Sequence, residues 1–156
     1  MHTTLLSNIE EILTSDPTLE DGLTKVCRKI QQTLPVYDWV GFYFHHNTKQ
    51  ELHLKAYAGN PTEHTVIPFG KGICGQVALT NQNFVVDDVG EQDNYIACSI
   101  DVKSEIVVPL FINNKNIGQI DIDSNTSHAF SKADEAFLVR VNILVAAFLI
   151  RCNITF

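Results

Sequence analysis

Basic residues are scarce in this 156-residue sequence. There are 11 Lys and Arg against 18 Asp and Glu, which gives a formal net charge of −7. Proteins that bind nucleic acids neutralise phosphates with clustered Lys and Arg, and no such run occurs here. The composition therefore argues against a nucleic-acid partner.

Long hydrophobic runs are absent as well. The most apolar segment, residues 136–150, contains Arg140 and Asn142 and is shorter than the roughly 20 residues that span a membrane. The first residues have no basic stretch and include Glu10 and Glu11, which is atypical of a signal peptide. We expect a soluble, cytoplasmic protein without a membrane partner.

Closely spaced cysteine pairs are the third absence. The four cysteines stand at positions 27, 74, 98 and 152, so no zinc-ribbon or thioredoxin-type spacing occurs. Without a secretory context we expect free thiols, and we expect neither a metal nor another cofactor. The length predicts one domain over residues 1–156.

Periodicity and turn residues divide the chain into helices and strands. Thr18 before Asp21 and Ser131 before Asp134 are typical of helix starts. The expected helices cover residues 4–14, 18–34 and 131–150, with a short one ending near residue 79 after a turn at 70–75. The expected strands cover residues 38–45, 51–57, 66–69, 84–86, 105–112 and 116–123.

The order of these elements predicts an α+β fold. The connections at 46–50 and 113–115 have hairpin length, so we expect a central antiparallel sheet. Helices near the two chain ends would cover one face of this sheet. Residues 58–103 would fold over the other face and form a pocket there.

Two acidic residues alternate with isoleucines near the end of the last strand. Asp121 and Asp123 are two residues apart, about 6.6 Å along a strand, on the face opposite Ile120 and Ile122. Two interpretations remain open at this point. The carboxylates line a solvated face, or they line a pocket where they bind an ammonium group or share a proton.

Two aromatic residues share one face of the first strand. Trp39 and Tyr43 are about 13 Å apart along the strand, with Gly41 between them. Such a pair either boxes an apolar ligand group or belongs to the core.

Residues 70–75 match the pattern GxGxxG. The match is weak because Pro68 breaks the preceding segment and the expected sheet is antiparallel, so we do not expect a nucleotide site. Cys74 falls in the first turn of the helix that follows, where free backbone N–H groups favour a thiolate. It is a better reactive candidate than Cys27, expected in the core, or Cys152, near the chain end.

Cys98 lies in a polar loop over residues 90–103. The neighbouring acids Asp93, Asp101 and Glu105 would raise its pKa if they were close. The loop position leaves two interpretations open: an incidental thiol, or a thiol presented to a ligand.

Several motifs now occur together in one order. They are residues 39–43 (WVGFY), 67–75 (IPFGKGICG), 96–98 (IAC), 104–110 (SEIVVPL) and 117–124 (IGQIDIDS). In this combination the chain resembles the free methionine-(R)-sulfoxide reductases, which are stand-alone GAF-domain enzymes. The resemblance covers residues 38–149. It implies a GAF-like fold and reduction of a small-molecule substrate, free L-methionine-(R)-sulfoxide. It also implies that thioredoxin regenerates the enzyme.

The resemblance also implies roles for individual residues. Cys98 matches the family's nucleophile, and Cys74 matches a cysteine of its thiol relay. The substrate-binding residues implied by the matched motifs are Glu105, Asp121 and Asp123 as pocket carboxylates, with Trp39 and Tyr43 as an aromatic wall.

The sequence departs from the family pattern at one position of the relay. A third cysteine is usual ten residues before Cys74, and this chain has His64 there. The relay would then run from Cys98 to Cys74 directly or use an outside thiol. The alternative function is a non-catalytic GAF module that binds a small molecule such as a cyclic nucleotide or an amino acid.

A homodimer is a further expectation, since stand-alone GAF domains often pair through terminal helices. The apolar stripe at residues 5, 6, 9, 12 and 13 would serve this purpose, unless it is buried within one chain.

Overall fold

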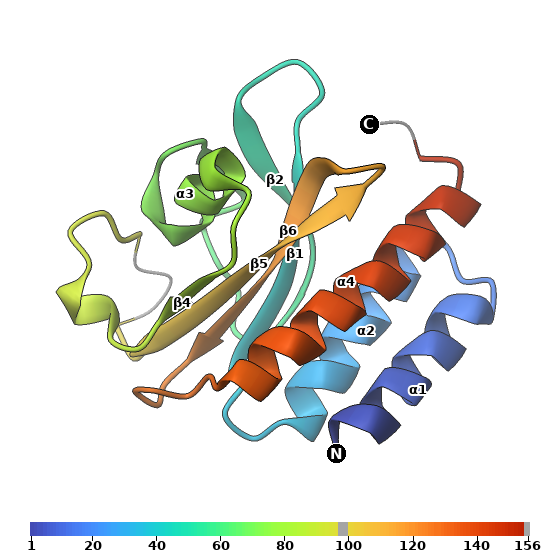
Figure 1. Cartoon of the computed structure of the whole chain (residues 1–156), viewed down its shortest axis with the longest axis horizontal. Helices are drawn as coiled ribbons and strands as arrows, with labels where there is room; N and C mark the ends of the chain where they lie inside the picture. Colours follow the sequence, from blue (N-terminus) through green and yellow to red (C-terminus); the bar gives the residue numbers. More distant parts are fainter. Residues whose placement is uncertain (97–99, 155–156) are drawn as a thin grey trace.

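The computed structural model describes residues 1–96 and 100–154. Its elements follow the predicted order, and Figure 1 shows them along the chain. The helices are α1 (His2–Thr14), α2 (Leu19–Thr33), α3 (Gly72–Thr80), the 3₁₀ turn η1 (Val89–Glu91) and α4 (Lys132–Arg151). The strands are β1 (Trp39–His45), β2 (Glu51–Ala58), β3 (Val66–Pro68), β4 (Phe84–Val86), β5 (Ser104–Ile112) and β6 (Lys115–Ser124).

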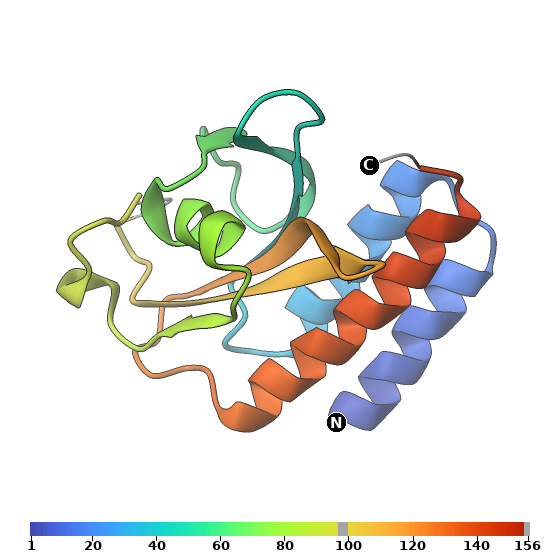
Figure 2. The same ribbon diagram turned by 45° about the horizontal axis from the view of Figure 1, so that its top comes forward.

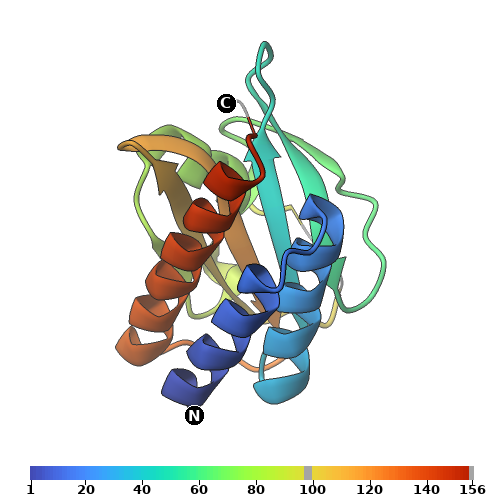
Figure 3. The same cartoon turned by 90° about the vertical axis from the view of Figure 1, so that its right-hand side faces the viewer.

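The six strands form one sheet in the order β3-β2-β1-β6-β5-β4, and every neighbouring pair is antiparallel. Helices α1, α2 and α4 cover one face, as Figure 3 shows from their side. Helix α3 lies on the opposite face (Figure 2). The predicted α+β architecture, with a central antiparallel sheet and helices on one face, is therefore confirmed.

The side chains of β1 alternate between the two faces of the sheet, and this alternation decides which of them pack against the helices and which lie on the α3 face. Val40, Phe42 and Phe44 belong to the hydrophobic core beneath α1, α2 and α4. Trp39 and Tyr43 point the other way and belong to a second cluster under α3. This division matches the prediction, because successive strand side chains point to opposite faces.

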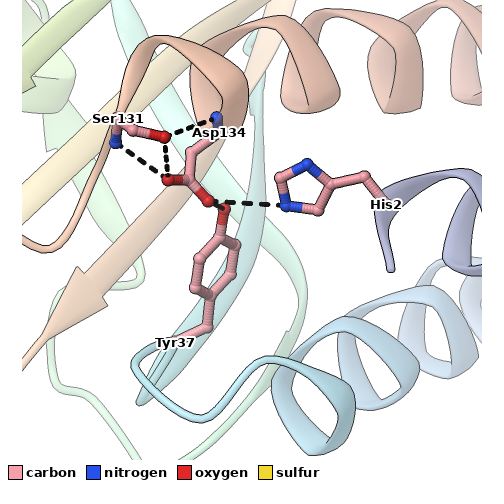
Figure 4. Close-up of polar contacts among 4 residues, drawn as sticks. All are labelled: His2, Tyr37, Ser131 and Asp134. Atoms are coloured by element: carbon pink, nitrogen blue, oxygen red, sulfur yellow. Dashed lines mark hydrogen bonds and ion pairs between the residues drawn. The ribbon is translucent and has the colours of Figure 1, made fainter.

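The helix starts also match the prediction. The Thr18 hydroxyl accepts a hydrogen bond from Asp21 N at 3.3 Å. At the start of α4, Ser131 and Asp134 form a reciprocal capping box. Asp134 also accepts a hydrogen bond from the Tyr37 hydroxyl at 2.7 Å and lies 3.6 Å from the His2 imidazole, as Figure 4 shows. One carboxylate thus joins the starts of α1 and α4 to the turn after α2.

The turn between β5 and β6 is the predicted hairpin. Asn113 and Asn114 have φ values of 51° and 64°, and Ile112 pairs with Lys115 across them. Two successive positive φ values are what a type I′ hairpin turn requires, and asparagine tolerates them better than most residues.

The apolar stripe of α1 is used within the chain. Leu5, Leu6, Ile9 and Leu13 are buried against the main core, so this stripe is not available to a second copy. None of the helices within residues 1–96 and 100–154 is both long enough and apolar enough to cross a membrane.

Candidate functional site

Three carboxylates are buried on the face of the sheet that α3 covers. Glu105 pairs with Asp123 across β5 and β6, and Asp121 follows on the same face of β6. Glu105 is 4% exposed, and Asp121 and Asp123 are each 1% exposed. The open question from the sequence is therefore answered: these acids do not line a solvated face.

Cys74 of α3 points at these acids. Its Sγ lies 3.2 Å from Asp121 Oδ2 and 4.0 Å from Glu105 Oε2, so the thiol donates toward the carboxylates. Ligand atoms of Cys74, Glu105 and Asp121 lie within 4.8 Å of one another. Thiolate and carboxylate groups this close are chemically able to hold a cation, or to share protons among themselves.

The expected thiolate at Cys74 is wrong. Burial, followed by the negative charges of Asp121 and Glu105, raises the pKa of the Cys74 thiol well above its ordinary value. The prediction placed Cys74 correctly in the first turn of α3 but considered only the helix end. Desolvation and nearby carboxylates outweigh the partial positive charge of one short helix, because both disfavour a second negative charge.

The pKa of Asp121 is raised by burial, while hydrogen bonds with Glu105 and Cys74 act in the opposite direction. A carboxyl with a raised pKa keeps its proton to a higher pH than an ordinary carboxyl and is able to donate it to a bound oxygen. The cluster of Cys74, Glu105 and Asp121 is therefore a buried group of proton donors and acceptors.

An aromatic wall borders the acids. The ring centroids of Trp39 and Tyr43 are 6.3 Å apart, because the Trp39 ring lies over Gly41 and fills the gap that the glycine leaves. A Cβ on Gly41 would come 2.2 Å from the Trp39 ring. The sequence reasoning missed Tyr57, which pairs with Gly41 from β2 and stacks on Trp39 at 5.7 Å. Its place on the neighbouring strand was not visible in the β1 pattern.

The chain after β2 is tied down onto this wall by two hydrogen bonds. Trp39 Nε1 donates to the Asn60 carbonyl oxygen at 3.0 Å, and the Tyr43 hydroxyl donates to the His64 carbonyl oxygen at 2.8 Å. The polar ends of both aromatic side chains thereby hold residues 60–64 over the sheet. This confirms that the chain after β2 folds over the pocket face.

Two small hollows open onto the site. His64, Lys71 and Ile96 line one of them together with Cys74, Glu105 and Asp121. Trp39 and Asp123 line the other, with Asn60, Thr62, Asp101 and Val102. Acids, a thiol, an aromatic ring and two basic side chains thus line these two small hollows.

The remaining cysteines are placed as follows. Cys98 lies outside the described residues, between Ile96 and Ile100. Cys27 is fully buried in the main core, as predicted, and Cys152 at the end of α4 is half-buried. The glycines of the GxGxxG match form a tight turn, with positive φ at Gly70 and Gly72. The strand before this turn, β3, pairs in an antiparallel way with β2, whereas a dinucleotide site needs a parallel sheet.

Comparisons with known proteins agree with this geometry. The profile of the GAF domain family matches residues 16–147. GAF domain-containing protein A of Dictyostelium discoideum is 35% identical over 137 residues, which cover 88% of this chain and 85% of that protein. The free methionine-R-sulfoxide reductase of Saccharomyces cerevisiae is 31% identical, over 88% of this chain and 83% of the yeast protein.

A solved structure extends the similarity to three dimensions. The free methionine-R-sulfoxide reductase from Neisseria meningitidis, in complex with its substrate, superposes with a TM-score of 0.92 at 30% identity, covering 97% of this chain and 90% of that one. Fold and sequence point the same way. This chain belongs to the GAF-domain family of free methionine-R-sulfoxide reductases.

Proposed function

We propose that this protein reduces free L-methionine-(R)-sulfoxide to methionine, with Cys98 as the nucleophile and Cys74 as the resolving thiol. The observation that carries the proposal is the buried cluster in which Cys74 contacts Asp121 and Glu105 beside the Trp39 and Tyr43 rings. The named relatives support the same substrate.

The first step needs a proton. A sulfoxide sulfur becomes electrophilic once its oxygen is protonated or hydrogen-bonded, and a buried acid such as Asp121 supplies that proton. The Cys98 thiolate attacks the sulfur, the oxygen passes to Cys98, and methionine leaves. Sulfur of the substrate is reduced by two electrons, and Cys98 is oxidised to a sulfenic acid.

The substrate is a zwitterion, and the site contains negative charges for its ammonium end. Those of Glu105, Asp121 and Asp123 that are ionised are able to bind the α-ammonium group of the substrate. Only a free amino acid carries this group, because a residue within a peptide has an amide there. The Trp39 and Tyr43 rings provide an apolar surface for the sulfoxide methyl group.

The second step uses Cys74. Its protonated thiol gives up a proton to a neighbouring carboxylate and attacks the Cys98 sulfenic acid, which forms a disulfide and releases water. Two thiols of thioredoxin then reduce this disulfide and become a disulfide themselves. With His64 in place of a third cysteine, this direct relay is the one we propose.

Variants of single cysteines test the proposal in a coupled assay with thioredoxin and its reductase. We expect Cys98→Ser to form no methionine. Cys74→Ser should form about one methionine per chain, and turnover should then stop even though thioredoxin is present. In this variant the sulfenic acid on Cys98 has no resolving thiol. Cys152→Ser is the matched control and should keep wild-type turnover.

Full turnover by Cys98→Ser would refute the assigned nucleophile. If no variant and no wild-type sample consumed the sulfoxide, calorimetry with the sulfoxide and with cyclic nucleotides would reveal a binding module instead.

We also propose a cytoplasmic homodimer. The three described cysteines are free thiols, which suits a reducing compartment. Val139, Ile143 and Ile150 leave an exposed apolar stripe along α4, 38%, 64% and 57% exposed. Light scattering should give twice the chain mass, and Ile143→Asp should lower it to one chain. Leu79→Asp, at an equally exposed apolar position on α3, should leave the dimer intact.

A further inference from the structure

Asn94 joins two segments that are distant in the sequence. Its Nδ2 donates to the Gly70 carbonyl oxygen at 2.7 Å, and its Oδ1 accepts from Gly72 N at 2.9 Å. One side chain thereby bridges both sides of the turn that begins α3. The contact gives a capping hydrogen bond to the start of a helix whose own N-cap residue, Lys71, provides none.

Gln76 completes the connection from the helix side. Its Nε2 donates to the Asn94 carbonyl oxygen at 3.1 Å and to the Gly72 carbonyl oxygen at 2.9 Å. The main chain of Asn94 is therefore held by α3, while its side chain holds the turn before α3. We call this set of Gly70, Gly72, Gln76 and Asn94 the Asn94 clamp.

An apolar contact supports the clamp two residues further on. A Cβ on Gly72 would lie 2.9 Å from Ile96 Cγ1, so the Ile96 side chain packs directly on the glycine. Gly72 also has a φ of 62°, which suits glycine best. Residues 94–96 are thus held against the start of α3 by polar and apolar contacts together.

The clamp lies next to both relay cysteines in the sequence. Cys74 follows Gly72 by two residues, and Cys98 follows Ile96 by two residues. A disulfide requires Cα atoms about 4.4–6.8 Å apart, so thiol exchange depends on how the two segments are held together. We propose that Asn94 is a positioning residue that sets the rate at which Cys74 resolves oxidised Cys98, an inference that rests on the proposed function.

Asn94 suits an experimental test because it is exposed and its hydrogen bonds described here join it to Gly70, Gly72 and Gln76, outside the acid cluster. Its loss should loosen residues 94–96 without creating a cavity in either core. The variants are Asn94→Ala and Gln76→Ala. Asn47→Ala, at an exposed position in the turn between β1 and β2, is the matched control.

The experiment follows one turnover of the reduced wild-type protein and the three variants. Each is mixed with L-methionine-(R)-sulfoxide, quenched with dimedone and an alkylating reagent, and analysed by mass spectrometry. We expect Asn94→Ala to form the Cys74–Cys98 disulfide about tenfold more slowly, as the loss of two hydrogen bonds would allow, with the sulfenic acid accumulating. In steady state kcat should fall more than KM changes, while the methionine released per chain in the single turnover should equal that of the wild type. A general loss of folding would lower that yield.

A second arm oxidises the same proteins with diamide, which couples thiols directly without any sulfoxide. Asn94→Ala should again be slow and Asn47→Ala should match the wild type. A wild type that forms the disulfide with diamide but releases no methionine from the sulfoxide would refute the proposed function. The diamide rates of the variants would still test the role of the Asn94 clamp in that case. Wild-type rates in Asn94→Ala in both arms, or no Cys74–Cys98 disulfide in any protein with either oxidant, would overturn the inference.

Discussion

The Cys74 thiol and the Asp121 carboxylate lie 3.2 Å apart between α3 and β6, buried from solvent. The two residues are 47 positions apart in the chain. Their contact makes the thiol a hydrogen-bond donor. Burial first, and then the charge of Asp121, raise the pKa of this thiol, since a thiolate there would face a carboxylate without water to screen it.

Replacing Asp121 should therefore change the acidity of Cys74. In Asp121→Asn we expect the pKa of the Cys74 thiol to fall, because a negative charge beside it is removed. Thiolate absorbance at 240 nm against pH, in the wild type and the variant, measures this. Asp93→Asn, in the exposed loop before Asn94, is the control that should leave the titration unchanged; an unchanged titration in Asp121→Asn as well would contradict the assigned cause.

Gly41 should be sensitive to the smallest substitution. In Gly41→Ala the new Cβ would meet the Trp39 ring at 2.2 Å, so the ring must move out of the wall. We expect KM for the sulfoxide to rise roughly tenfold, corresponding to about 1.4 kcal/mol of lost binding.

The matched control is Gly90→Ala, in the 3₁₀ turn, where a Cβ would meet only the Asp88 side chain at 3.1 Å. A crystal structure of Gly41→Ala with Trp39 in its original place would show that the close approach does not matter.

The Asp134 junction should contribute to stability. Tyr37→Phe removes the 2.7 Å hydrogen bond to Asp134 and should lower the free energy of unfolding in urea by about 1 to 2 kcal/mol. Tyr57→Phe, on the opposite side of the sheet and 36% exposed, is the control with little expected effect. Equal losses in both variants would argue against a special role for this bond.

The same junction should make the free energy of unfolding depend on pH in the acid range. Burial raises the pKa of Asp134, but hydrogen bonds from Ser131 and Tyr37 outweigh it and leave the pKa below its ordinary value of 3.8. The folded state therefore releases this proton more readily than the unfolded chain. Its contribution is present above pH 3.8 and is lost as the pH falls through the lower folded value. Asp134→Asn should flatten urea stability curves in that window.

Cys27 should make stability fall in alkali. Burial raises the pKa of its thiol far above the ordinary value of 9.0, so above pH 9 the unfolded chain loses a proton that the folded chain keeps. Stability then decreases as pH rises from about 9. Cys27→Ala should show a smaller decrease over this range, measured by urea unfolding at several pH values, with Cys152→Ser as control. An unchanged slope in Cys27→Ala would show that other groups cause the alkaline loss.

Local sequence determined much of the architecture. The alternation of β1, the capping pairs at Thr18 and Ser131, and the Asn113–Asn114 turn each depend on residues a few positions apart, so their patterns predicted the structure. Element ends shifted by small amounts, and β5 and β6 proved slightly longer than expected. The motif resemblance correctly indicated the family.

Tertiary structure decided the properties of the site. Whether Asp121 and Asp123 meet water depends on α3 and on residues 60–64, which are held over that face of the sheet. The acidity of Cys74, the stacking of Tyr57 on Trp39 and the contact of Asn94 with Gly70 all join distant parts of the chain. Desolvation and charge proximity act through space, so a pattern read along the chain shows which groups are present but not which of them share a buried volume.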